Sequence, residues 1–203
     1  MWDSMDEPKC GTGRSQFEAA YGKPALDGSL NGLRPEEFYP MDQQFQHILR
    51  DPGQPDRKDW TGKVAFRWDE QYLYASFIVL DNDLSLLDFT SRDWRDNDNL
   101  RLMLSGESDP AKRTELLSEK DLLLIMTPTG ISHTEGPMAA AASLGGFVRD
   151  GIETKIKLAS KVWAGGYTLE VAIPLSELQV KAAPGVKLGL NALSDDADGG
   201  FRR

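Results

Sequence analysis

Apolar and polar positions alternate along much of the chain, as they do in half-buried β-strands. Residues 63–68 alternate between polar and apolar, residues 69–71 form a polar turn, and residues 72–80 are aromatic and β-branched. Residues 152–158 also alternate, with Ile, Thr, Ile and Leu on one face and Glu, Lys and Lys on the other. Because successive side chains of a strand point to opposite faces, these patterns predict a hairpin over 63–80 and a further strand over 152–158.

The remaining strands are predicted between turn residues. A second hairpin is expected where residues 164–166 (Ala-Gly-Gly) separate two apolar segments, and residues 175–178 fit one helical turn. Residues 138–142 are expected to form a loop or a helical turn. The other predicted strands are 43–49, 99–104, 121–127, 162–163, 167–173 and 187–193.

Short strands punctuated by turns, with almost no helical periodicity, predict an all-β fold. We expect an antiparallel two-sheet β-sandwich, jelly-roll-like, with at most one or two short helical turns; a barrel is the alternative. The length of 203 residues suits one core. Residues 1–15 are polar and glycine-containing and predict a flexible lead-in, followed by a single β-sandwich domain over residues 16–203.

Charge and composition exclude several function classes. The formal net charge of −9 argues against nucleic-acid binding, which usually needs a basic surface. The longest apolar runs fall far short of a membrane-spanning helix, and the first ten residues do not resemble a secretory signal. Cys10 is the only cysteine, so neither an internal disulfide nor a thiolate zinc site is expected.

No catalytic constellation is apparent in the sequence. His47 and His133 are the only histidines, and neither lies near a predicted nucleophile. A hydrolytic triad is therefore not expected. We predict that the chain is not an enzyme.

Three ordered segments carry a resemblance to a known family. They are residues 26–28 (Leu-Asp-Gly), 67–74 (Arg-Trp-Asp-Glu-Gln-Tyr-Leu-Tyr) and 165–174 (Gly-Gly-Tyr-Thr-Leu-Glu-Val-Ala-Ile-Pro). The chain resembles the family 9 carbohydrate-binding modules. The resemblance implies a β-sandwich that holds a sugar between aromatic side chains, often binds structural calcium and is usually appended to extracellular polysaccharide-degrading enzymes. A carbohydrate partner, an extracellular or cell-envelope location, a larger multidomain parent and no organic cofactor are the resulting expectations.

The resemblance also points to a ligand site. Trp94, which precedes an acidic stretch leading into a strand, matches the family's sugar-contacting tryptophan. Arg101 stands where the family carries a carboxylate, and the next strand, 122–126, offers only apolar side chains. The second aromatic of the clamp lies beyond the region matching residues 195–198, so either the clamp is incomplete or the final strand lies beyond Arg203. The ligand-binding candidates are Trp94, Arg92, Arg95, Arg101 and Trp163.

Arginine side chains in such a site have two alternative roles. Arg92, Arg95 and Arg101 would hydrogen-bond sugar hydroxyls or a uronate carboxylate, or would pair with neighbouring aspartates. A calcium site is the corresponding hypothesis for the acidic residues, because carboxylates are the ligands that calcium prefers. No EF-hand spacing is present, and solvated acidic loops are the alternative. The metal-ligand candidates are Asp81, Asp83, Asp96 and Asp98.

Two other function classes remain open at this point. A structural or assembly domain would keep the sandwich and lose the sugar site, as Arg101 and the apolar strand 122–126 suggest. A haem-binding electron-transfer relative would use axial ligands such as Met103 and Met126, with Lys161 or Lys187 available.

Overall fold

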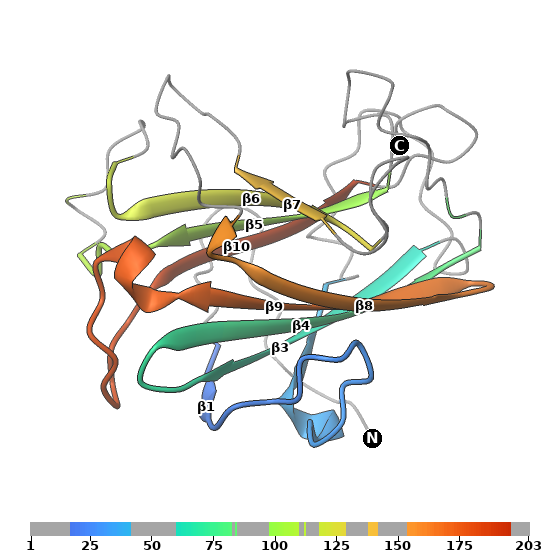
Figure 1. Cartoon of the computed structure of the whole chain (residues 1–203), viewed down its shortest axis with the longest axis horizontal. Helices are drawn as coiled ribbons and strands as arrows, with labels where there is room; N and C mark the ends of the chain where they lie inside the picture. Colours follow the sequence, from blue (N-terminus) through green and yellow to red (C-terminus); the bar gives the residue numbers. More distant parts are fainter. Residues whose placement is uncertain are drawn as a thin grey trace, which may run out of the picture.

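Two β-sheets pack face to face in the computed structural model (Figure 1). The structure describes residues 17–41, 60–82, 84, 98–109, 112, 118–128, 138–141 and 154–195, with residues 138–141 and 195 described by their backbone only. No helix in these ranges is long and apolar enough to cross a membrane.

The larger sheet has the strand order β1-β3-β4-β9-β8, with β2 also paired to β3. Its strands are β1 (Ala20–Tyr21), β2 (Phe38–Pro40), β3 (Trp60–Trp68), β4 (Tyr72–Asp81), β8 (Lys157–Trp163) and β9 (Gly166–Pro174). The short β1 runs parallel to β3, and the other pairings in this sheet are antiparallel.

The smaller sheet has the order β10-β5-β6-β7 and is antiparallel throughout its described pairs. Its strands are β5 (Asn99–Ser105), β6 (Asp121–Thr127), β7 (Met138–Ala141) and β10 (Gly189–Asp195). Two short 3-10 helices, η1 (Pro35–Glu37) and η6 (Leu175–Leu178), complete the described elements. The predicted two-sheet β-sandwich and the turn over 175–178 are confirmed.

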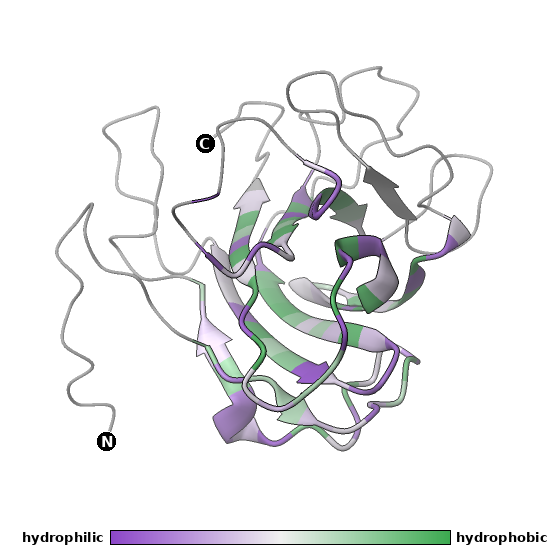
Figure 2. Ribbon diagram, turned by 90° about the vertical axis from the view of Figure 1, so that its left-hand side faces the viewer, coloured by the Kyte–Doolittle hydropathy of each residue, from purple (hydrophilic) through white to green (hydrophobic). Residues whose placement is uncertain are grey.

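The core lies between the sheets and follows the predicted alternation. On β4, Phe77 and Val79 point inward, and on β6, Leu124 and Met126 do so; all four are fully buried. Each buried side chain of this size stabilises the fold by about 1.5–3 kcal/mol. In Figure 2, green hydrophobic bands run along the strands where the two sheets face each other.

One predicted strand starts at the wrong place. Thr154 and Lys155 lie in a helical turn, and β8 begins only at Lys157; residues 152 and 153 lie outside the described residues. The tight turn at Ala164 and Gly165 fixes the pairing of β8 with β9, from Lys157 opposite Ala172 to Trp163 opposite Gly166. This pairing, and not the local alternation of residues 152–158, sets the bounds of the strand.

The expectation of a loop or helical turn over residues 138–142 was also wrong. Residues Met138–Ala141 form the edge strand β7, which pairs with residues 124–127 of β6. Alanine has a low intrinsic preference for strands, so this assignment rests on backbone pairing with a neighbour. The predicted strand 43–49 lies outside the described residues.

Candidate functional site

Several strand ends gather at one end of the sandwich, which we call the loop end. In the larger sheet Trp60 pairs with Asp81, and in the smaller sheet Asn99 pairs with Asp195. Figure 1 shows both sets of strand ends on its right-hand side. The chain leaves β4 and enters β5 at this end, so the predicted site residues on these strands share one end of the molecule.

Arg101 lies on β5, on the face of the smaller sheet that points away from the core. Leu100 and Leu102 point into the core, and Arg101 between them points outward. Its cross-strand partners are Ile125 on β6 and Leu193 on β10. The Nε of Arg101 donates a hydrogen bond of 3.4 Å to Oδ1 of Asn99. A cation therefore stands beside apolar neighbours on this face, as the sequence suggested.

Trp163 lies on the other outer face of the sandwich. Trp163 ends β8 opposite Gly166. The residue after Gly166 on β9, Tyr167, is buried in the core. The side chain of Trp163 is 41% exposed. Trp163 and Arg101 share the loop end, but they point outward from opposite sheets, so one small ligand would not contact both.

The structure describes two of the four candidate metal ligands. Asp81 ends β4 and Asp98 immediately precedes β5, and both are buried. Asp83 and Asp96 lie outside the described residues. Within the described ranges, no three carboxylate, histidine or cysteine groups come close enough to hold a metal ion. The calcium site stays a prediction.

The three remaining ligand candidates, Arg92, Trp94 and Arg95, lie outside the described residues. The described chain stops at Leu84 and resumes at Asp98, at the loop end.

The two methionines suggested as haem ligands point in opposite directions. Met126 pairs with Leu100 and is fully buried in the core, whereas Met103 pairs with Leu123 on the outer face. Because the sheet separates their side chains, Met103 and Met126 cannot bind one iron together. This removes the pair on which the haem hypothesis depended.

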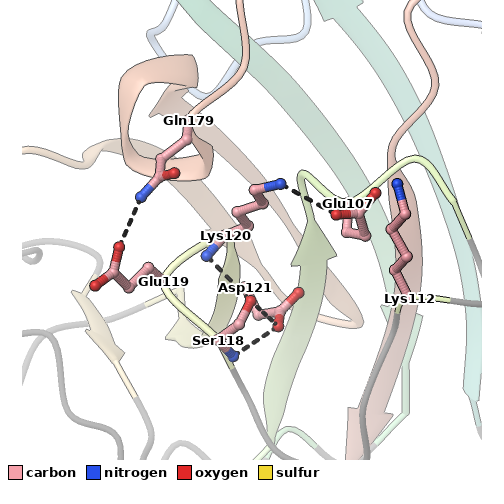
Figure 3. Close-up of a pocket in the computed structure, with 7 residues that line it drawn as sticks. All are labelled: Glu107, Lys112, Ser118, Glu119, Lys120, Asp121 and Gln179. Carbon is pink, nitrogen blue, oxygen red and sulfur yellow. Dashed lines mark hydrogen bonds and ion pairs between the residues drawn. The ribbon is translucent and has the colours of Figure 1, made fainter.

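A polar pocket of about 350 Å³ lies at the opposite end of the sandwich (Figure 3). Its polar groups interact with one another: Lys120 Nζ lies 3.0 Å from Glu107 Oε2, and Gln179 Nε2 donates to Glu119 Oε2 at 3.1 Å. No aromatic side chain is among the described residues that line it, so it offers no surface for stacking on a sugar ring. The lining residues are Glu107, Lys112, Ser118, Glu119, Lys120, Asp121 and Gln179.

Comparison with known proteins identifies the family of the chain. Residues 39–203 match the family described as Carbohydrate family 9 binding domain-like. The chain belongs to this family. The resemblance seen in the sequence is confirmed, and the chain is a carbohydrate-binding module.

Solved structures of family 9 modules share the fold. A family 9 module from Caldicellulosiruptor kristjanssonii in complex with cellotriose superimposes with a TM-score of 0.68 at 20% identity, covering 92% of this chain and 80% of that one. The glucose complex from the same organism gives 0.67 at 20% identity, with 91% and 80% covered. A putative carbohydrate-binding protein from Bacteroides uniformis gives 0.51 at 11% identity, with 82% and 74% covered.

A longer enzyme contains a similar stretch. The chain is 25% identical over 188 residues to endo-1,4-beta-xylanase A of Thermotoga maritima, which covers 89% of this chain. The chain spans 14% of the length of that relative.

Two of the three sequence segments that resemble family 9 contact each other around a buried carboxylate. Glu170 on β9 has no exposed surface, and its Oε2 accepts hydrogen bonds from the backbone N–H of Gly28 (2.6 Å) and Asp27 (3.0 Å). Thr168 Oγ1 donates to the carbonyl of Gly28 at 2.5 Å. Burial raises the pKa of Glu170, and this effect exceeds the opposite effect of the two N–H donors, which lower it. An acidic residue inside the apolar run 169–173 was the sequence feature that could have revealed this role.

The third segment is held by an ion pair that the sequence did not reveal. Arg67 on β3 contacts Glu37 with Nη2 2.8 Å from Oε1 and Nε 2.8 Å from Oε2. Arg34 Nε lies 2.9 Å from the same Oε1. These donors lower the pKa of Glu37 to about 2. No local pattern links residues so far apart in the chain.

Proposed function

We propose that this module is non-catalytic, binds a glucose-type oligosaccharide at the loop end, and tethers a larger secreted glycan-active protein to its substrate. The observation that carries the proposal is the family 9 match, combined with a fold shared with modules solved with cellotriose and glucose. The alignment with a xylan-degrading enzyme over a small part of its length supports the multidomain setting.

Trp94 is the proposed stacking platform. The C–H groups on one face of a pyranose ring are apolar and slightly positive, so they pack on the negative face of an indole, while the hydroxyls hydrogen-bond to polar groups around it. Arg92, Arg95 and Arg101 would supply donors to these hydroxyls. In place of the acceptor that a carboxylate would provide, Arg101 offers only N–H groups, so hydroxyls facing β5 would act as acceptors.

Calorimetric titration tests the proposal. We expect saturable binding of glucose or cellotriose, and at least about tenfold weaker binding by Trp94→Ala because both apolar contact and stacking are lost. Tyr21→Ala is the control, since Tyr21 is an exposed aromatic at the far end of β3. Repeating the titration after chelation tests calcium: an unchanged affinity and melting temperature would exclude a structural ion.

Tethering is tested with a reporter protein fused to the module. The wild-type fusion should be retained on insoluble cellulose, and the Trp94→Ala fusion should wash off. Retention of both fusions to the same extent would contradict a tether that depends on the sugar site.

A structural or assembly role is the second candidate. The position of Arg101 between Ile125 and Leu193, where a sugar-binding carboxylate was expected, favours it. No binding across neutral mono- and oligosaccharides, with a well-folded protein, would support this role over the proposed one.

A further inference from the structure

The outer face of the larger sheet carries an aromatic and apolar surface at the loop end. In one row across the strands lie Leu80 and Gly166, followed by Trp163 on the edge strand. In the next row lie Ile78 and Thr168, with a lysine at each side. We call the set of Trp163, Leu80, Ile78, Lys63 and Lys161 the Trp163 platform.

The indole of Trp163 lies beside Gly166. A Cβ at position 166 would come within 3.0 Å of Trp163 Cζ2 and 3.2 Å of the Leu80 Cα. The ring therefore occupies space that a side chain at position 166 would need. Leu80 remains 49% exposed and Trp163 41% exposed, so an aromatic and an aliphatic side chain adjoin on the exposed part of this face. The 27–28 turn covers the neighbouring Thr168, which donates to the Gly28 carbonyl.

Two exposed lysines border this surface. Lys63 on β3 and Lys161 on β8 lie in the same row, three strand spacings apart, which is about 14 Å. Neither forms an ion pair with a residue in the described ranges. Two carboxylates lie close enough to Lys161 for its charge to lower their pKa: Asp27, whose side chain accepts hydrogen bonds from Ser29, and Glu170, which is buried beneath the 27–28 turn.

We propose that the Trp163 platform is a second glycan-binding surface, which takes a polysaccharide carrying carboxylate groups. A sugar ring would pack on Trp163 and Leu80, and uronate carboxylates along the chain would meet Lys63 and Lys161. The net charge of −9 disfavours polyanions over the rest of the surface. At physiological ionic strength this long-range repulsion is screened within about 8 Å, so Lys63 and Lys161 can attract carboxylates that come close to them.

This surface is separate from the proposed sugar site beside Arg101. The two lie on outer faces that point in opposite directions, so both can be occupied together. The inference goes beyond the proposed function, and removing Trp94 should leave it intact.

The test uses glucuronoxylan and the same polymer after its carboxyl groups have been reduced to alcohols. Binding is measured by affinity electrophoresis in the Trp94→Ala background and in wild type, with thermal unfolding to verify the fold of each variant. We expect the carboxylated polymer to bind, and Trp163→Ala to weaken binding about tenfold. Trp163→Phe, which keeps an aromatic ring, should recover most of the loss.

Charge is tested with a matched pair of double variants. Lys63→Gln with Lys161→Gln should weaken binding of the carboxylated polymer about fourfold and reduce its salt dependence. Lys181→Gln with Lys187→Gln removes the same charge from exposed positions away from the platform and should change nothing.

Four results would overturn the inference. They are loss of all binding in Trp94→Ala, equal binding of the reduced polymer, equal effects of the two lysine pairs, and binding to phosphatidylserine vesicles in preference to the polymer. Loss of all binding in Trp94→Ala would show that the polymer binds only at the proposed sugar site. Failure of glucose or cellotriose to bind the wild-type protein would contradict the proposed function and leave this inference untouched.

Discussion

Replacing Glu37 by Gln should remove a defined part of the acid sensitivity of the fold. Glu37 has 7% of its side chain exposed and receives both arms of the Arg67 guanidinium as well as Arg34 Nε. The hydrogen bonds from Arg67 are the largest cause that lowers its pKa, from 4.5 to about 2. Because the folded-state pKa is the lower one, the carboxylate stabilises the fold above pH 4.5, and this contribution is lost as the pH falls toward 2.

The magnitude follows from the pKa shift. Each pKa unit corresponds to about 1.4 kcal/mol, so the full shift sets an upper limit of about 3 kcal/mol. Arg34 is largely exposed, and solvent screening reduces such interactions, so we expect about 1–2 kcal/mol. The difference in unfolding free energy between wild type and Glu37→Gln should shrink by the larger part of this amount between pH 6 and pH 3.

Urea unfolding followed by tryptophan fluorescence at several pH values measures this difference. Glu36→Gln is the matched control, because Glu36 is 65% exposed and contacts only the exposed Arg34 among the described cations, at 3.5 Å. Because an exposed ion pair contributes little to stability, Glu36→Gln should change the unfolding free energy by no more than about 0.5 kcal/mol. Parallel wild-type and Glu37→Gln curves from pH 6 to pH 3 would refute the reasoning, since the native pKa of Glu37 would then be close to its unfolded value.

Two further predictions concern the contact between the 27–28 turn and β9. Gly28→Ala should destabilise the fold by about 2 kcal/mol or more, because the added Cβ would lie 2.5 Å from the Ser160 carbonyl carbon at a φ of +73°; Gly32→Ala, at φ +84° with no atom within 4 Å, should cost about 1 kcal/mol. Thermal and urea unfolding compare the two, and equal losses would exclude the close contact as the cause. Glu170 has a raised pKa, so its contribution is fully present below its unfolded pKa and is lost as the pH rises through the folded one. Glu170→Gln should therefore gain stability relative to wild type as the pH rises from 4 to 8, and a constant difference would contradict this.

Local patterns in the sequence predicted strands where pairing and alternation agree. The hairpin of β3 and β4 was predicted from residues 63–80 because its turn residues and its apolar face point to the same register. Residues 152–158 alternate equally well, yet β8 starts at Lys157 because the turn after Trp163 fixes its pairing. For β7 the alanines carry little preference, and the strand exists because β6 offers it a partner.

Alternation along a strand indicates which side chains point away from the core, but it does not indicate which of the two sheets the strand joins. In the structure, Arg101 and Trp163 each lie on the face of their strand that points away from the core. Which sheet a strand joins depends on pairings between residues far apart in the chain, and these pairings place the two side chains on opposite outer faces. A single site containing both was therefore an assumption about topology. With the topology known, Arg101 belongs with the proposed sugar site on the smaller sheet, and Trp163 belongs to the separate surface bordered by Lys63 and Lys161.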